Sequence, residues 1–247
     1  MDTAAKDRVR GVLDAHWPGD FIFPHDRNGV MKRYGSVVLG EYDQLLLQYS
    51  ESETEENRRK LLAFLYRTGL FAETYSDHLL RSRETLLSLL AYFSERKDAF
   101  TIADLGSGIG KISLGLAACL PQVERVYAVE CLSSGLQSMQ EEKKKLDPSV
   151  SRKLHAFHGN YLHSGLAKEL VSLNKRPFDV ALFSFFESSL EEALITGSAL
   201  IHDRGEIILS GDSNVFLRSD TSRGEEIDSF YFEAHDTLLQ VYSFSKN

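Results

Sequence analysis

The stretch that decides the fold is Ala103-Asp104-Leu105-Gly106-Ser107-Gly108-Ile109-Gly110-Lys111. It follows a run of β-type residues and precedes an apolar stretch with helical period, so we expect a strand, a tight turn and a helix. Three glycines at alternating positions let the backbone turn sharply and bring its amides close to a ligand, because no Cβ stands in the way. The spacing is G-x-G-x-G, with an acid two positions before the first glycine, and differs from the G-x-G-x-x-G of dinucleotide sites.

The acid at this turn favours a cationic ligand over a phosphate. A dinucleotide site needs an open helix N-terminus for pyrophosphate, whereas S-adenosylmethionine carries an ammonium and a sulfonium group and no phosphate. The next predicted strand ends at Glu130, whose carboxylate can accept hydrogen bonds from the ribose hydroxyls. We interpret these features as an S-adenosylmethionine site; a plain strand-to-helix turn and a nucleotide-binding fold are the alternatives. The expected cofactor-binding residues here are Asp104, Gly106, Ser107, Gly108, Gly110, Lys111 and Glu130.

The pattern of the chain changes near residue 98. Before it the apolar residues recur with helical period, at Val9 and Leu13 and over Glu55–Thr68 and Ser76–Arg96. Thr54, followed by two glutamates, is a capping residue at a helix start. Asn28-Gly29, between the apolar runs Phe21-Ile22-Phe23 and Val30-Met31, suggests a β-hairpin.

After residue 98, short β-rich runs alternate with helical stretches, which predicts parallel strands joined by crossover helices. The strand candidates are Phe100–Asp104, Arg125–Val129, Lys153–Phe157, Val180–Phe185 and Glu206–Leu209. The last two runs, Ile227–Phe232 and Thr237–Phe244, lie one tight turn apart and favour an antiparallel hairpin. We therefore expect an α/β fold with a mostly parallel, Rossmann-like seven-stranded sheet over residues 71–247, as in class I methyltransferases, and a mainly helical region over residues 1–70.

The composition excludes several classes of protein. With 247 residues, 43% hydrophobic and 26% charged, the chain is neither disordered nor too short for a large core. The net charge of −8 argues against a protein that coats nucleic acid. Its 2 cysteines and 8 histidines show no metal-ligand spacing, so we expect no metal site. We also expect no signal peptide, no membrane span and a reducing compartment.

Two further strand ends carry candidate site residues. Asn160 and Tyr161 follow the third strand, where they would bind the edge and cover the face of the adenine; a polar turn with one packed aromatic is the alternative. The fourth strand ends in Phe183-Ser184-Phe185-Phe186-Glu187, where an acceptor would lie, because ligands bind at the carboxyl ends of parallel strands. Ordinary core packing is the alternative for these aromatic residues.

Several motifs together resemble the disruptor-of-telomeric-silencing family of non-SET histone lysine methyltransferases. Phe71-Ala72-Glu73-Thr74-Tyr75-Ser76 is similar to that family's Tyr-Gly-Glu-Thr loop, and the glycine turn matches its Asp-Leu-Gly-Ser-Gly-x-Gly. Gly159-Asn160-Tyr161-Leu162 resembles its Gly-Asp-Phe-Leu, and Ser229-Phe230-Tyr231 its Ser-Tyr-Tyr. The resemblance covers about residues 65–245. Ser184 stands where the family has an Asn-Asn pair.

The resemblance implies a nuclear chromatin regulator that methylates a lysine on the globular core of histone H-three in the nucleosome. It implies that Glu73 and Thr74 close over the methionine end of the cofactor. The expected residues of the acceptor channel are Ser184, Phe185, Phe230 and Tyr231. Methyl transfer to an amine is an in-line displacement that depends on positioning, and an apolar channel helps to deprotonate the lysine.

Other functions remain open at this point. The missing Asn-Asn pair suggests a class I methyltransferase for a non-histone protein, RNA or small molecule, or a non-catalytic cofactor-binding module. Arg58-Arg59-Lys60 and Lys143-Lys144-Lys145 are candidates for local DNA phosphate contacts. Because glutamates lie next to both runs, solvated helix faces are the other interpretation.

Overall fold

The computed structural model describes residues 3–16, 27–68, 70, 76–184, 190–211, 225–232 and 237–243. Its strands form one sheet with the order β3-β2-β1-β4-β5-β7-β6. The strands are β1 (Phe100–Leu105), β2 (Val123–Glu130), β3 (Leu154–His158), β4 (Phe178–Ser184), β5 (Ile201–Gly211), β6 (Glu225–Phe232) and β7 (Thr237–Ser243).

The sheet confirms the expected α/β layout in the described residues. Strands β1 to β5 are parallel, whereas β7 runs antiparallel to both β5 and β6. β1 is buried along its whole length, as expected of a central strand covered by helices on both faces. Because the strands are parallel, their carboxyl ends meet at one edge of the sheet, and the acids predicted at Asp104 and Glu130 lie at that edge.

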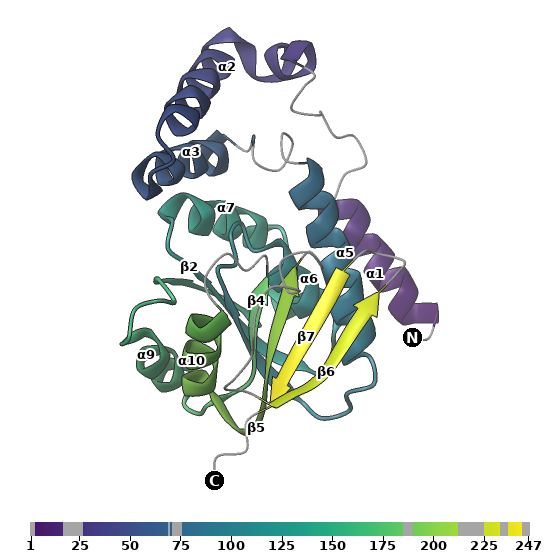
Figure 1. Cartoon of the computed structure of the whole chain (residues 1–247). Helices are drawn as coiled ribbons and strands as arrows, with labels where there is room; N and C mark the ends of the chain where they lie inside the picture. Colours follow the sequence, from purple (N-terminus) through teal and green to yellow (C-terminus); the bar gives the residue numbers. More distant parts are fainter. Residues whose placement is uncertain are drawn as a thin grey trace.

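Helices cover both faces of the sheet (Figure 1). Those that follow the first four strands are α6 (Lys111–Cys119), α7 (Ser133–Lys144), α9 (Leu166–Asn174) and α10 (Leu190–Leu200), and a short α8 (Pro148–Ser151) precedes β3. On one face, α6 packs with α1 (Thr3–His16) and α5 (Ser76–Phe93) into the larger core cluster. On the other face, α9 and α10 pack into the second cluster.

The helices α2 (Arg27–Glu51) and α3 (Glu55–Thr68) form a pair with a core of its own above the carboxyl edge of the sheet (Figure 1). The start of α3 is as expected, because Thr54 Oγ1 accepts a hydrogen bond of 3.3 Å from the amide of Asn57. The pair meets the sheet body at α7, where Ser138 Oγ donates a hydrogen bond of 3.2 Å to the carbonyl of Tyr66.

The expected hairpin at Asn28-Gly29 is wrong, because both residues lie in the first turn of α2. Val30 and Tyr42 are buried in the core that α2 shares with α3, and five partly buried side chains pack against it: Tyr34, Val38, Leu39, Leu45 and Tyr49. The helix is kinked at Gly35, whose backbone angles are not helical (φ 84°, ψ 168°). The burial of these apolar side chains stabilises a helix here more than the Asn28-Gly29 pair favours a turn. Residues 21–23, the other half of the expected hairpin, lie outside the described residues.

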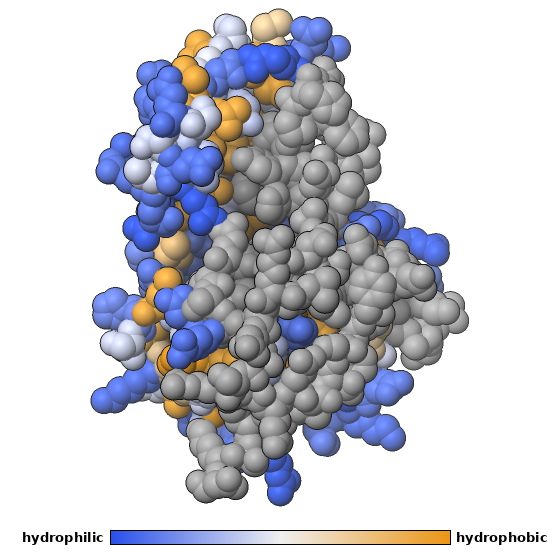
Figure 2. Space-filling model, in the orientation of Figure 1, coloured by the Kyte–Doolittle hydropathy of each residue, from blue (hydrophilic) through white to orange (hydrophobic). Residues whose placement is uncertain are grey.

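The outer surface of the helix pair is mixed in character. Apolar side chains reach the surface of α2 among charged ones, and Figure 2 shows them as orange patches between blue side chains. Within the described residues, no helix is both long enough and apolar enough to span a membrane.

Candidate functional site

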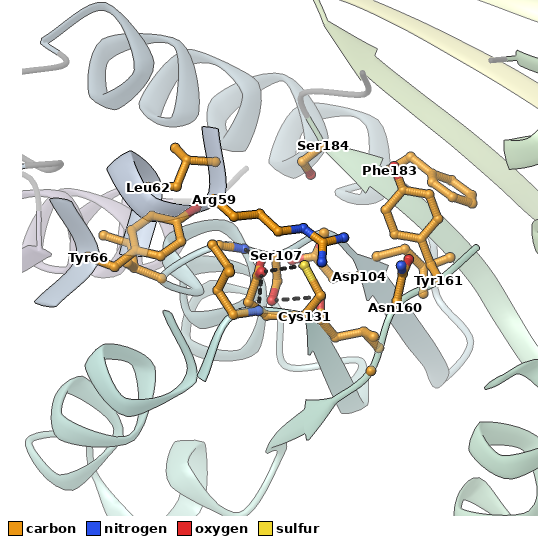
Figure 3. Close-up of a pocket in the computed structure, with 18 of the residues that line it drawn as sticks. Arg59, Leu62, Tyr66, Asp104, Ser107, Cys131, Asn160, Tyr161, Phe183 and Ser184 are labelled. Carbon is orange, nitrogen blue, oxygen red and sulfur yellow. Dashed lines mark hydrogen bonds between the residues drawn. The ribbon is translucent and has the colours of Figure 1, made fainter. Parts of the chain in front are cut away.

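A cavity of about 390 Å³ opens at the carboxyl edge of the sheet, between the sheet and α3 (Figure 3). Its floor is the glycine loop after β1, with the ends of β2 and β4 and the turn after β3 around it. Its size suits a small-molecule ligand, and it lies where open α/β sheets bind their ligands. The sequence predicted this edge as the site.

The glycine loop is held in its turn by backbone hydrogen bonds to β2. The amides of Gly106 and Ser107 both donate to the carbonyl of Val129, at 3.0 and 2.9 Å. Gly106, Gly108 and Gly110 have φ angles of 76°, 58° and 77°, which explains why the turn needs glycine at these positions. At Gly106 and Gly108, which line the cavity, the loop thus presents backbone without a side chain.

Glu130 lies at the end of β2 with only 6% of its surface exposed. Its Oε2 accepts a hydrogen bond of 2.8 Å from the amide of Gly108, and its Oε1 one of 2.8 Å from the amide of Leu132. The thiol of Cys131 also donates to Oε1, at 3.3 Å. A carboxylate has about four acceptor positions, so Glu130 keeps one for a ligand hydroxyl and gains a second where the ligand displaces the thiol, which is a weak donor. This geometry suits the ribose role expected of it.

Asp104 is fully buried at the end of β1. Its Oδ2 accepts a hydrogen bond from the hydroxyl of Ser113 on α6, whereas its Oδ1 has no partner among the described residues. Burial raises the pKa of Asp104 to about 6; the hydroxyls of Ser113 and Ser184 oppose this rise, and Glu130 adds to it. The pKa of Asp104 thus lies close to neutral pH, and a nearby cation would favour its ionised form.

Asn160 and Tyr161 also line the cavity, as predicted. The Oδ1 of Asn160 accepts a hydrogen bond of 3.0 Å from the amide of Leu162, which leaves its Nδ2 hydrogens as donors for a base. Tyr161 packs edge-on against Phe183, with 5.6 Å between ring centroids. The Cε1 atom of Tyr161 lies 3.4 Å from where a Cβ on Gly106 would stand, so the ring flanks the glycine loop.

Ser184 is the one predicted acceptor residue whose side chain the structure places. It lines the cavity, is 7% exposed, and its Oγ has no hydrogen-bond partner among the described residues. The hydroxyl is close enough to Asp104 to lower the pKa of that carboxyl, without the geometry of a hydrogen bond. Phe185, Glu73 and Thr74 lie outside the described residues, and Phe230 and Tyr231 are described only as backbone of β6, paired with Leu239 and Leu238.

Lys111, expected to bind the cofactor, begins α6 and lines the cavity. Burial lowers the pKa of its ammonium group, although Glu142 opposes this. Within the described part of the chain, no three His, Cys, Asp or Glu side chains gather as they would around a metal ion.

The roof of the cavity comes from α3, which the sequence did not mark as part of the site. Arg58, Arg59 and Tyr66 all line the cavity, and Glu55 holds the Arg59 guanidinium at 3.0 Å. Figure 3 shows Arg59 reaching across the cavity, with Tyr66 on one side. Ser82, a buried residue of α5, also lines the cavity. In the sequence these residues are marked only by the basic run Arg58-Arg59-Lys60 and by the helical period over Glu55–Thr68. Neither pattern predicts that α3 lines a ligand cavity.

Two of the three lysines in the run Lys143-Lys144-Lys145, at the end of α7, pair with glutamates of the same helix, as on a solvated helix face. Lys144 and Lys145 pair with Glu141 and Glu142, at 2.6 and 2.7 Å, one turn earlier. Lys143 differs, since its Nζ donates a hydrogen bond to the carbonyl of Leu154 at the start of β3.

No protein-family model matches the chain, and no curated protein matches it. Solved structures do resemble it. The glycopeptide N-methyltransferase MtfA matches with a TM-score of 0.50 and 12% identity, over 65% of this chain and 95% of that one. MtfA complexed with S-adenosyl-L-methionine matches with a TM-score of 0.43 and 12% identity, over 66% and 76% of the two chains. The putative methyltransferase yhhF from Escherichia coli matches with a TM-score of 0.49 and 11% identity, over 66% and 86%.

The strand order and the likeness to the first of these structures define the class of fold: the chain has the fold of class I, S-adenosylmethionine-dependent methyltransferases. At 12% identity the likeness establishes the fold alone. The expected resemblance to the histone methyltransferase family stays a prediction.

Proposed function

We propose that this chain is an S-adenosylmethionine-dependent methyltransferase. The observation that supports this most strongly is the Asp104 carboxyl group, which is fully buried at the cavity with Oδ1 unpartnered among the described residues. An unpaired buried carboxylate is costly. A ligand with an ammonium group supplies both the missing donor and the opposite charge.

The other residues of the cavity fit the rest of this cofactor. Glu130 accepts the ribose hydroxyls, the Asn160 amide donates to the adenine edge, and Tyr161 flanks the glycine loop. Two carboxylates around a glycine loop are poorly suited to a pyrophosphate, which argues against the nucleotide-binding alternative. When bound, S-adenosylmethionine supplies an activated methyl group, and the role of these side chains is to orient it and exclude water.

As acceptor we propose first a lysine on the globular core of histone H-three in a nucleosome, with the nucleus as the place of action. The motif resemblance supports this choice, as does Ser184, a buried hydroxyl at the cavity without a partner among the described residues. Lysine has an ordinary pKa of about 10.4 and must lose a proton before transfer. The aromatic rings of Tyr161 and Phe183 line the same cavity as Ser184, and an apolar lining disfavours the ammonium form.

A second candidate acceptor is a non-histone protein, an RNA or a small molecule. The observation that favours it is the pair Arg58 and Arg59 lining the cavity, because their positive charge repels a lysine ammonium. MtfA, which shares the fold, is described as a glycopeptide N-methyltransferase. The two acceptor proposals share the same cofactor site.

Binding and transfer assays test these proposals in order. Calorimetry with S-adenosylmethionine should show binding that Asp104→Ala abolishes and that Asp203→Ala, an exposed charge-matched control, leaves intact. Labelled S-adenosylmethionine is then incubated with nucleosomes, free histones or a total cell extract. Label on nucleosomes supports the first acceptor, and label only in the extract supports the second. Binding without any labelling would contradict methyltransferase activity and leave a cofactor-binding module.

A further inference from the structure

The roof helix α3 lies over the part of the cavity where β2 ends at Glu130 and is followed by Cys131. We propose that α3 completes the cofactor site: Tyr66 binds the ribose of the cofactor, and Arg59 covers the adenosine from the open side. This proposal rests on the proposed S-adenosylmethionine site and adds to it two residues from outside the sheet body.

The position of Tyr66 supports the first half of the proposal. The ring is buried between two glycines: a Cβ on Gly108 would lie 3.2 Å from its hydroxyl oxygen, and a Cβ on Gly135 would lie 3.3 Å from its Cδ2. The same Cβ on Gly135 would lie 3.1 Å from Cγ of Glu130. Tyr66 and Glu130 therefore share one side of the cavity, and a ribose held by the carboxylate lies within reach of the phenol.

The protonation state of Tyr66 suits a donor. Burial raises the pKa of its phenol above its ordinary value, and the negative charge of Glu130 raises it further. The hydroxyl therefore keeps its proton at neutral pH. A ribose hydroxyl that donates to Glu130 also has lone pairs that can accept from Tyr66. The same hydroxyl can therefore bind both side chains at once.

Arg59 has the reach and the chemistry to cover the base. Its guanidinium extends over the cavity, between Tyr66 and the side chains of Asn160 and Tyr161 (Figure 3). It also lies near the end of β2: burial raises the pKa of Cys131 to about 11, together with Glu130, and the charge of Arg59 opposes this rise. A planar guanidinium stacks on aromatic faces, and Glu55 holds this one in place from one helical turn away.

Tyr66 also ties the helix pair to the sheet body. Its carbonyl accepts the hydrogen bond from Ser138 on α7, while its ring contacts the glycine loop. The α2–α3 pair has its own core and meets the body at this place. A cofactor bound under Tyr66 would therefore hold α3 against α7.

Calorimetry on the full chain with S-adenosylhomocysteine as the probe tests the proposal. We expect Tyr66→Phe to weaken binding about 10-fold, the effect of one buried hydrogen bond. We expect Arg59→Gln to weaken it about 5-fold, as for one cation–π contact. Lys60→Gln is the matched control: it removes a positive charge from the same helix at an exposed side chain that pairs with Glu56, and it should leave affinity unchanged.

The 2′,3′-dideoxy analogue of the probe separates a contact from a structural effect. If Tyr66 binds the ribose, Tyr66→Phe should have no measurable effect on the affinity for this analogue. An equal loss with both probes would overturn the ribose contact, and normal binding of S-adenosylhomocysteine by both variants would overturn the proposal as a whole. If the unaltered chain fails to bind the probe, the proposed function fails first, and this proposal fails with it.

Discussion

The backbone amide of Gly108 donates a hydrogen bond of 2.8 Å to Oε2 of Glu130, so the glycine loop after β1 is fastened to the acid at the end of β2. One side chain thereby serves both the shape of the loop and the charge of the cavity. Ligand binding and local stability are coupled at this point, because the same carboxylate is needed for both.

Replacing Glu130 should therefore affect folding and binding together. Glu130→Ala leaves the amides of Gly108 and Leu132 without their acceptor, and we expect a loss of about 2 to 4 kcal/mol in the free energy of unfolding. Affinity for S-adenosylhomocysteine should fall about 100-fold, the effect of two charge-assisted hydrogen bonds. Urea denaturation and calorimetry measure the two effects. Glu124→Ala, on the same strand but exposed and paired with Arg176, is the control; unchanged affinity in Glu130→Ala would refute the ribose role.

Because Asp104 is buried, we expect the free energy of unfolding to fall as the pH rises through the pKa of its carboxyl group. Its folded pKa of about 6 lies above the unfolded value of 3.8, so its ionisation opposes folding. Its contribution to stability is complete below about pH 4 and is lost as the pH rises through 6. At about 1.4 kcal/mol per pH unit, the difference amounts to about 3 kcal/mol. The free energy of unfolding of Asp104→Asn, relative to that of the unaltered chain, should therefore rise by about 3 kcal/mol from pH 4 to pH 8. Urea denaturation at each pH measures this difference.

A cationic ligand should reverse this dependence. Because an ammonium group favours the ionised carboxylate, affinity for S-adenosylmethionine should rise as the pH increases from 5 to 7. Asp104→Asn should bind weakly and lose the pH dependence, whereas Asp203→Asn, an exposed acid, should keep it. A flat profile in the unaltered chain would show that Asp104 does not meet the cofactor.

Gly110 should tolerate no side chain, because its φ angle is 77° and an added Cβ would lie 2.6 Å from Cγ of Met139. Gly110→Ala should lower the free energy of unfolding by about 2 kcal/mol, because the backbone is strained and the flexible side chain of Met139 is displaced. Gly40→Ala is a control with the opposite sign. It lies inside α2 with no heavy atom within 4 Å of an added Cβ, and it should gain about 0.5 to 1 kcal/mol. If the urea midpoints of Gly110→Ala and Gly40→Ala moved in the same direction, the requirement for glycine at position 110 would be contradicted.

Ser184 should matter for transfer more than for folding. Its hydroxyl is buried without a partner among the described residues, so Ser184→Ala should leave the free energy of unfolding unchanged or raise it by up to about 1 kcal/mol. Affinity for S-adenosylhomocysteine should stay the same, while the rate of labelling of the accepted substrate should fall. Ser198→Ala, on the exposed side of α10, is the control. An unaltered rate in Ser184→Ala would remove it from the acceptor site.

The floor of the cavity could be predicted from the sequence because each of its residues comes directly after a strand. Asp104, Glu130 and Ser184 end β1, β2 and β4, and the rule that ligands meet the carboxyl ends of parallel strands brings such residues together without knowledge of packing. The glycine loop carries its own local signal, since three positive φ angles in five residues require glycine.

The roof could not be predicted in this way. Tyr66 and Arg59 lie on the cavity only because α3 docks on α7 and above the glycine loop, and no local pattern encodes that docking. The hairpin expected at Asn28-Gly29 failed for a related reason: the turn signal is local, whereas the burial of Val30 against α3 depends on residues about 30 positions later in the chain. The boundary expected at residue 70 stays a prediction.

The position of α1 has a consequence for how the molecule assembles. Val9 and Leu13 are buried in the core cluster that α5, α6 and the central strands form, about 100 residues further along the chain. Contacts this distant in sequence close large loops, which slows their formation. We expect α1 to pack only after the strands and helices that receive it have been synthesised, so its apolar face stays exposed on the nascent chain until then.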